Sequence, residues 1–180
     1  MSDRELLDRV ALQHLVFSYC HAIDRRDYAL LRSLYHDDAI DDHGAMFCGS
    51  PDAYVAWLPG MMVQWQATSH TMTNMLFLFD DDRPEGDHAE GELACTAWHR
   101  TADGAQDLII HGRYLDRYRK RDGAWKFWRR ALVLDRAEQH PAPAGGAPGA
   151  DDGVESGRPG LDDPCYRHLP LFRQRREAHK

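Results

Sequence analysis

Three long runs of strand-forming residues follow one another in the second half of the chain, with only short polar turns between them. Asp103-Gly104 and Asp122-Gly123 occupy these turns, and an Asp-Gly pair between such runs is a strong β-hairpin signal. Strands joined by tight turns pair antiparallel, so the sequence predicts a meander of long strands. Together with one preceding stretch rich in Thr, Phe and Leu, the expected strands cover residues 68–79, 88–101, 107–120 and 124–135.

Helical signals dominate the part of the chain before these strands. Apolar residues first recur at three- and four-residue spacing, and Ser2 with Glu5 forms a capping-box pattern. Asp27 and Pro51 are suited to begin two further helices. Helices followed by strands indicate the α+β class. The expected helices cover residues 2–24, 28–35 and 51–65, with a turn at 36–38 and a short strand at 39–43.

The end of the chain differs in composition from the rest. Residues 141–160 hold six Gly and four Pro, which is typical of a flexible linker. An apolar cluster follows, and its members are Cys165, Tyr166, Leu169, Leu171 and Phe172. We therefore predict a main domain at 1–136, a linker at 137–163 and a tail at 164–180. The tail is expected to dock on its own domain or on a neighbouring subunit, with plain disorder as the alternative.

Composition excludes several classes of function. The 180-residue chain has a net charge of −7, which disfavours binding to nucleic acid or to an anionic membrane surface. The longest apolar run is Met75–Phe79, far short of the ~20 residues of a membrane helix, and the charged N-terminus lacks a signal-peptide core. A cytoplasmic location is expected. The four cysteines are scattered and the histidines lack ligand spacing, so neither a metal nor a cofactor is predicted.

Histidines on the expected strands are the first candidates for chemistry. Strand alternation puts His70 on one face with Met72 and Asn74, and it puts His99 on one face with Cys95. A neutral imidazole on an apolar wall is a proton acceptor suited to physiological pH, although it can also be a hydrogen-bonded core residue.

Asp24 and Tyr19 are the second pair of candidates, at the end of the first expected helix. A buried Asp24 could orient an imidazole, and the Tyr19 phenol could donate to a developing oxyanion. The alternatives are a turn residue paired with Arg25 or Arg26 for Asp24, and a core aromatic for Tyr19.

The outer face of the meander is expected to carry Trp98, Tyr114, Tyr118 and Trp128 among a cluster of arginines that includes Arg130. Exposed aromatic residues in such number are typical of a partner surface, so we predict a homo-oligomer.

Several short stretches, in this order, are similar to one known family. They are YCHAIDRRD at 19–27, LLRSLY at 30–35, DDAIDDHG at 37–44, TSH at 68–70 and YRKRDGAWKF at 118–127. Over residues 1–136 the chain resembles the SnoaL-like branch of the nuclear transport factor 2-like superfamily. The resemblance implies a cone-shaped, curved antiparallel sheet wrapped around N-terminal helices and enclosing a deep pocket.

The resemblance also implies an activity and a set of site residues. Members include scytalone dehydratase, bile-acid dehydratases, hexachlorocyclohexane dehydrochlorinase and formaldehyde-releasing lyases, and members are dimers or trimers. The dehydrochlorinase lysine falls at Tyr19, which disfavours dehydrochlorination, and the pocket serine and asparagine of scytalone dehydratase fall on Gly112 and Tyr114, which disfavours scytalone. Catalytic roles are implied for Asp24, His70, His99 and Tyr19, and substrate-binding roles for Asp42, His43, Met72, Asn74, Cys95 and Tyr114.

We therefore expect a cofactor-independent lyase that acts on a small hydrophobic, aromatic or polycyclic hydroxylated compound by dehydration or formaldehyde release. The alternatives are a ketosteroid-type isomerase or polyketide cyclase, and a non-catalytic ligand-binding or assembly domain.

Overall fold

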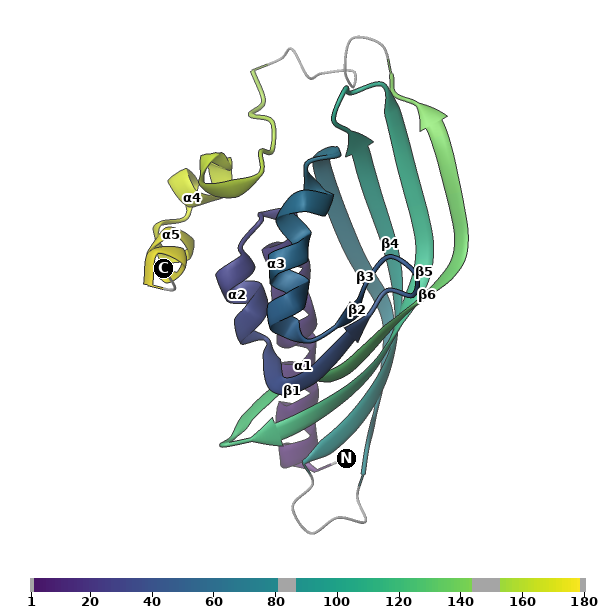
Figure 1. Ribbon diagram of the computed structural model, residues 1–180. Helices are drawn as coiled ribbons and strands as arrows, with labels where there is room; N and C mark the ends of the chain where they lie inside the picture. The colour runs from purple at the N-terminus through teal and green to yellow at the C-terminus, as the bar shows by residue number, and fades with distance from the viewer. Residues whose placement is uncertain (1, 81–86, 144–152, 179–180) are drawn as a thin grey trace.

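The computed structural model describes residues 2–80, 87–143 and 153–178, which form helices packed against one curved sheet. In Figure 1, α1 to α3 lie on one side of the sheet and the chain ends in α4 and α5 beyond them. The elements in chain order are α1 (Asp3–Asp24), α2 (Tyr28–Ser33), β1 (Tyr35–Asp42), β2 (Cys48–Gly49), α3 (Pro51–Met62), β3 (Trp65–Phe79), β4 (His88–Thr101), β5 (Gln106–Arg121), β6 (Ala124–Pro141), η1 (Gly160–Asp162), α4 (Pro164–His168) and α5 (Pro170–Ala178).

Each of the first three helices begins at the cap that the sequence predicts. Ser2 Oγ accepts from the backbone N–H of Glu5 at 3.2 Å, and Asp27 Oδ1 accepts from that of Leu30 at 3.1 Å. Ser50 caps α3, which has a proline in its first turn, as expected. Within the described ranges, the helices are too short or too polar to cross a membrane.

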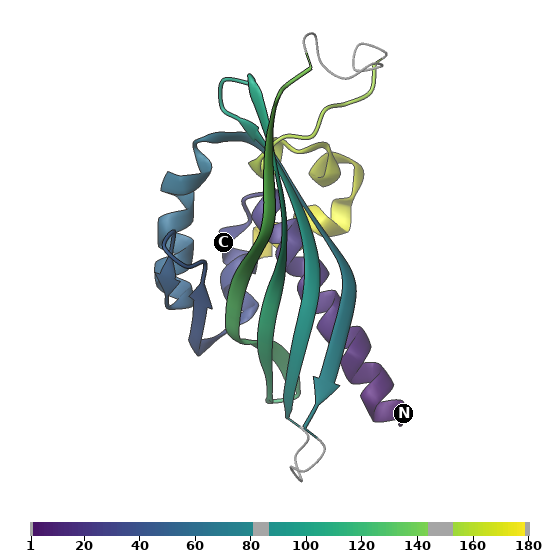
Figure 2. The same ribbon diagram turned by 90° about the vertical axis from the view of Figure 1, so that its right-hand side faces the viewer.

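The sheet has the strand order β2-β1-β6-β5-β4-β3, and the last four strands in the chain form the predicted meander. Figure 2 shows these long strands side by side, with the helices behind them. The α+β class is confirmed, but the sheet is mixed because β1 runs parallel to β6. Asp42 at the end of β1 pairs with Ala131 in the middle of β6, so the turn after β1 lies beside that strand, where it can contribute to a site.

The second Asp-Gly turn is a two-residue hairpin. Arg121 pairs with Ala124, and the two residues between them have positive φ angles of 52° for Asp122 and 76° for Gly123. A two-residue hairpin of this kind needs positive φ at both positions, which Asp and Gly tolerate. Local chemistry therefore determines the pairing of β5 with β6.

Element boundaries differ from the prediction where tertiary pairing extends a strand. Residues 36–38 lie within β1 rather than in a turn, because this strand pairs with β6 at Tyr35 and again from Ile40, with a register shift between the two. The third helix ends at Met62, since Trp65 already pairs with Thr101. Strand β6 continues to Pro141, into the expected linker, of which residues 144–152 lie outside the described part of the chain.

Tyr114 and Tyr118 lie on the inner face of the sheet, contrary to the prediction. Tyr114 is directly opposite the buried Leu93, and opposite residues of an antiparallel pair share a face. Tyr118 is fully buried by the same alternation. The outer face therefore carries Trp98 and Trp128, and the homo-oligomer stays a prediction.

Arg130 is also buried, although the sequence predicts it on a charged outer face. Its guanidinium donates from Nε and Nη2 to the two carboxylate oxygens of Asp116 at 2.8 and 2.7 Å. Arg130 and Asp116 are cross-strand partners, and both side chains are fully buried. An arginine is accommodated here because a buried carboxylate on the next strand balances its charge.

The tail packs against the turn that follows α1. Arg176 donates to the carbonyl oxygens of Arg25 and Arg26 at 2.9 and 3.1 Å, and Asp163 pairs with Arg25 at 3.4 Å. The Tyr166 side chain is buried there. The other apolar members of the tail cluster are largely exposed, namely Leu169, Leu171 and Phe172. The described part of the tail thus supports the segment next to Asp24.

Candidate active site

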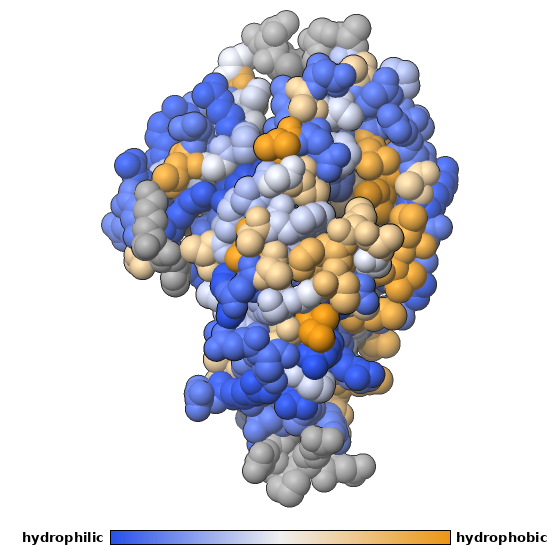
Figure 3. Space-filling view, in the orientation of Figure 1, coloured by the Kyte–Doolittle hydropathy of each residue, from blue (hydrophilic) through white to orange (hydrophobic). Residues whose placement is uncertain are grey.

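A cavity of about 330 Å³ lies between the inner face of the sheet, α1 and α3. Figure 3 shows apolar side chains gathered on the middle of this side of the molecule, with polar side chains toward its ends. The cavity wall is mostly apolar, with a few polar groups, which is the usual composition of a small-molecule site. Its polar lining includes Tyr19, His43, Tyr54, His70, His99 and Tyr114.

Asp24 and His70 form a hydrogen-bonded pair at this cavity. Asp24 is the last residue of α1, and His70 lies on β3. The ring Nδ1 of His70 is 2.7 Å from Asp24 Oδ1, and the backbone N–H of His70 donates to Oδ2 at 2.8 Å. The hydroxyl of Thr68 donates to Oδ1 at 2.9 Å. Asp24 does not line the cavity itself but lies behind His70 and orients it.

Asp24 is held as a carboxylate. Burial alone would raise its pKa, but the hydrogen bonds and charge of His70, together with the Thr68 hydroxyl, bring that pKa below its ordinary value. A carboxylate can only accept, so in the neutral form of His70 the proton is on Nδ1. The Nε2 nitrogen is then left with a free lone pair, which is the state a general base needs.

The sequence left open that Asp24 is a turn residue paired with Arg25 or Arg26, but the two arginines have other partners. Arg25 pairs with Asp163 of the tail. Arg26 has a φ of 54° and donates to the Thr68 hydroxyl at 3.2 Å. Arg26 therefore positions the Thr68 hydroxyl, which in turn donates to Asp24.

His99 lies beside His70 on the neighbouring strand. The two imidazole rings meet edge to face with centroids 5.4 Å apart, and the Trp65 ring is 4.9 Å from His99 on another side. Burial and the neighbouring His70 lower the pKa of His99 to about 4. His99 is thus neutral near pH 7, and it can hydrogen-bond to a ligand without adding charge to the cavity.

Tyr19 and Tyr54 place two phenol groups together in the cavity wall. Their hydroxyl oxygens are 3.0 Å apart, and the Tyr114 ring meets the Tyr19 ring edge to face at 5.8 Å. Burial raises the pKa of all three phenols well above the ordinary value. The Arg130 guanidinium lies 4.1 Å from the Tyr19 ring centroid. Neutral phenols beside a buried cation are suited to donate hydrogen bonds to a negatively charged oxygen.

The other expected binding residues divide between the cavity and the surrounding structure. His43, Cys95 and Tyr114 line the cavity. Met72 is buried in the core without lining the cavity, and Asp42 accepts instead from the backbone N–H of Gly44.

Asn74 does not share the face of His70. The register of β3 against β4 shifts between Thr73 and Leu76, and Asn74 there has a φ of 45° and is exposed. Strand alternation predicted otherwise because a bulge changes the face on which the following residues lie.

Three contributors were missed from the sequence. Tyr54 and Trp57 belong to α3 and line the cavity, and their apolar spacing could have indicated a helix face turned inward. Asp41 also escaped notice, because nothing in its local sequence distinguishes it from Asp42. Only its fully buried position shows that it differs.

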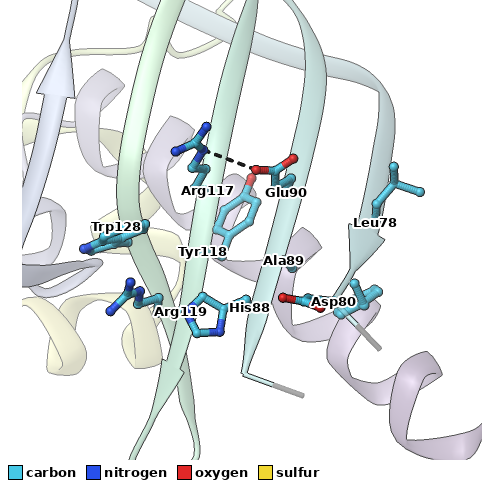
Figure 4. A pocket seen from close by; sticks show the side chains of 10 residues that line it. Leu78, Asp80, His88, Ala89, Glu90, Arg117, Tyr118, Arg119 and Trp128 are labelled. Carbon is cyan, nitrogen blue, oxygen red and sulfur yellow. Dashed lines mark ion pairs between the residues drawn. The ribbon is translucent and has the colours of Figure 1, made fainter. Parts of the chain in front are cut away.

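A second hollow lies outside the sheet and has a different character. Figure 4 shows its lining, with Arg117 paired to Glu90 at 3.2 Å and Arg119 near Trp128. The Arg119 guanidinium is 3.6 Å from the centroid of the Trp128 ring. Arg117 and Glu90 are matched in charge on the open surface, so this hollow is a weaker candidate than the inner cavity.

No cluster of three or more His, Cys, Asp or Glu side chains that could hold a metal ion occurs among the described residues. The polar groups of the inner cavity are acids, bases and hydrogen-bond donors. What the chain itself can supply there is proton transfer and oxyanion binding.

A curved sheet around N-terminal helices, with acid–base groups in the cavity between them, defines a class of small α+β pocket proteins. The chain belongs to the family of SnoaL-like domains, within the nuclear transport factor 2-like superfamily, and the family model matches residues 4–131. The expected resemblance is therefore confirmed. None of the curated protein sequences matches the chain.

Solved structures show which proteins share this fold. A candidate scytalone dehydratase from Novosphingobium aromaticivorans is 28% identical with a TM-score of 0.69, and the match covers 82% of this chain and 99% of that one. Hexachlorocyclohexane dehydrochlorinase LinA is 25% identical with a TM-score of 0.70, over 81% of this chain and 96% of LinA. The type 2 form of this enzyme is 23% identical with a TM-score of 0.71, and the match covers 85% of this chain and 100% of that one. At this identity the match shows a shared fold. Distant structural relatives thus include lyase-type enzymes.

Proposed function

We propose that this protein is a cofactor-independent lyase that eliminates water or another small group from a hydrophobic, aromatic or polycyclic hydroxylated compound. The observation that carries the proposal is the Asp24–His70 pair, with its 2.7 Å contact, at the wall of an apolar cavity. A carboxylate behind an imidazole is the arrangement that makes the remote nitrogen a proton acceptor.

The proton transfer would run through His70. Its Nε2 takes a proton from the carbon next to the bond that breaks, and Asp24 stabilises the imidazolium that forms. General base catalysis of this kind contributes about 10²–10⁴-fold to the rate. Tyr19 and His99 would bind the oxygen on which negative charge develops, and exclusion of water from the cavity strengthens these interactions.

The names of the structural relatives support an elimination. A candidate scytalone dehydratase and a dehydrochlorinase share the fold, and both names describe the loss of a small molecule from a ring compound. The position that resembles the dehydrochlorinase lysine carries Tyr19, a neutral donor, and this favours an oxygen-containing substrate over a halide. The apolar lining of about 330 Å³ favours a small hydrophobic one.

A product assay on a panel of aromatic, steroid and polyketide alcohols tests the proposal. We expect mass spectrometry to find a product lighter by water or formaldehyde, and the variant His70→Ala to make it at least about 100-fold more slowly. His111→Ala is the matched control, because His111 is a half-exposed histidine outside the cavity. Near-normal turnover by His70→Ala would rule out the proposed base.

A ketosteroid-type isomerase is the second candidate. The Tyr19–Tyr54 hydroxyl pair favours it, because neutral phenols can also hold the enolate of an isomerisation. The same assay separates the two, since an isomerase conserves the mass of its substrate. A binding-only domain would bind members of the panel and return them unchanged.

A further inference from the structure

A second carboxylate–imidazole pair faces the same cavity from another element. The ring Nδ1 of His43, just after β1, lies 2.6 Å from Asp41 Oδ1, an ion-pair distance when the ring is protonated, although the two atoms do not have hydrogen-bond geometry. His43 lines the cavity, whereas Asp41 is fully buried behind it. The two atoms lie as close as those of His70 and Asp24, but only the His70–Asp24 contact is a hydrogen bond.

Asp41 is held in place by a second partner. The Tyr35 hydroxyl donates to Asp41 Oδ2 at 2.5 Å, so the two carboxylate oxygens are directed to two different side chains. A fully buried carboxylate is costly unless such partners satisfy it. The Tyr35 hydroxyl therefore fixes the position of Asp41, which places a buried negative charge beside the His43 ring.

The ring of His43 is also positioned by aromatic contacts. It stacks on Tyr54 with centroids 5.4 Å apart and an interplanar angle of 20°, and it meets Tyr114 edge to face at 6.1 Å. The backbone N–H of His43 donates to the carbonyl of Phe47 at 2.7 Å, which closes the turn next to α3 (Figure 1). With Nδ1 directed to Asp41, Nε2 is the nitrogen left for a ligand.

The two imidazoles approach the cavity from opposite sides. His43 follows β1 and His70 lies on β3, and the strand order places β6, β5 and β4 between these strands. Each ring lies beside its own buried carboxylate, so a protonated, positively charged His43 can give a proton from Nε2 while a neutral His70 accepts one.

We propose that His43, beside the buried carboxylate of Asp41, is the general acid of this site and that the leaving group is an oxygen which must be protonated as it departs. The proposal rests on the elimination proposed above and adds the class of substrate: a hydroxyl or alkoxyl group β to a carbonyl. A halide leaves without a proton and would not need this group.

The step balances without a co-reactant. His70 Nε2 takes the proton from the α carbon, and the electron pair of that C–H bond forms the carbon–carbon double bond. The Cβ–O bond breaks with its electrons on oxygen, and His43 Nε2–H protonates that oxygen, so that a hydroxyl leaves as water. Proton exchange with solvent then returns both imidazoles to their starting states.

Two ketones that give the same product test the proposal. The first, 3-hydroxy-1-phenylpropan-1-one, must lose water, whereas 3-(4-nitrophenoxy)-1-phenylpropan-1-one loses a stable phenolate that needs no proton. We expect His43→Gln to lower the rate of elimination from the hydroxy ketone at least about 100-fold, and that from the nitrophenoxy ketone less than about threefold. Equal losses on both would overturn the proposal, since His43 would then only shape the cavity.

Two further variants separate this result from the proposed function. His70→Ala should slow both ketones alike, and if it slows neither, the proposed elimination fails whatever His43 does. His111→Gln should change neither rate, because His111 lies outside the cavity, where its ring contacts Thr96 at 3.3 Å and Glu138 at 3.8 Å.

A measurement without substrate tests the pair if His43→Gln fails to fold or neither ketone reacts. Nitrogen-15 spectra of the wild-type imidazoles should show that His43 loses its proton from Nε2 and keeps it on Nδ1, which faces Asp41. Asp41→Asn should change that preference. Deprotonation at Nδ1 in the wild-type protein would overturn the proposal.

Discussion

The carboxylate of Asp24 holds His70 at two points, one on its backbone and one on its ring. Oδ2 accepts from the backbone N–H at 2.8 Å, while Oδ1 lies 2.7 Å from the ring Nδ1. The end of α1 thus fixes both the place of β3 and the tautomer of its imidazole. Position and protonation state are set by the same two oxygens.

Replacing Asp24 by asparagine should preserve the shape of this contact but reverse the direction of the hydrogen bond to His70. The amide can donate to Nδ1 of His70, which moves the ring proton to Nε2 and removes the base. We expect kcat on the nitrophenoxy ketone to fall about 10²–10⁴-fold with little change in KM. Release of 4-nitrophenolate gives the rate, and Asp135→Asn on the exposed surface is the control. Wild-type kcat in Asp24→Asn would contradict the assigned role.

His99 should make the protein less stable in mild acid. Its pKa is lowered to about 4 in the folded state, below the ~6.5 of an unfolded histidine, so the unfolded chain binds a proton first. As pH falls from about 6.5 toward 4, the free energy of unfolding should therefore decrease. Protonation of His99 should account for about 2 kcal/mol of this decrease between neutral pH and pH 5. Above pH 6.5 the contribution is constant.

Urea unfolding at pH 7.5 and pH 5 measures this effect when wild type is compared with His99→Gln. The variant cannot take up the proton, so it should lose about 2 kcal/mol less between the two pH values. An equal loss in both proteins would show that His99 titrates normally in the fold.

The buried pair of Arg130 and Asp116 should be essential for stability. Arg130→Met leaves the Asp116 carboxylate buried without its cation, and we expect this to cost about 3–5 kcal/mol of unfolding free energy. The double variant Arg130→Met/Asp116→Asn should recover part of the loss, because an amide carries no charge. Arg113→Met, at an exposed pair with Asp135, should cost less than about 1 kcal/mol. A similar small cost at Arg130 would refute the prediction.

The tail should stabilise the turn after α1. Arg176→Ala removes the donor to the Arg25 and Arg26 carbonyls, and we expect it to lower the unfolding free energy by about 1–3 kcal/mol. Chemical denaturation measures the loss, and the exposed neighbour Arg175→Ala is the control. Equal stability of both variants would mean that the docking contributes nothing. A truncation test should cut after Pro143, because β6 extends to Pro141.

Most helices and strands could be predicted because their signals are local. Ser2, Asp27 and Ser50 cap the helices that follow them, and Asp122-Gly123 forms the hairpin turn that its φ preferences indicate. These interactions span only a few residues, so short stretches of sequence contain them completely. The meander and the α+β class follow from them.

The inward direction of Tyr114 and Arg130 was harder to predict. Both follow from cross-strand register, since Tyr114 lies opposite Leu93 and Arg130 opposite Asp116. Residue type alone suggested a charged and aromatic outer face. The bulge at Asn74 shows the same limit, because one shifted residue changes the face of those after it.

For the candidate site, the sequence by itself determined which groups are available, and the resemblance associated Asp24 with His70. Only the tertiary structure decided which groups meet: it joined Asp24 to His70 across two layers, and it made Asp41, not Asp42, the partner of His43. The physical reason is the distance along the chain over which each interaction is decided. Caps and turns are decided within a few residues. The face on which Asp41 lies and the hydrogen bond between Asp24 and His70 depend instead on strand register and helix packing, which the whole folded chain sets together.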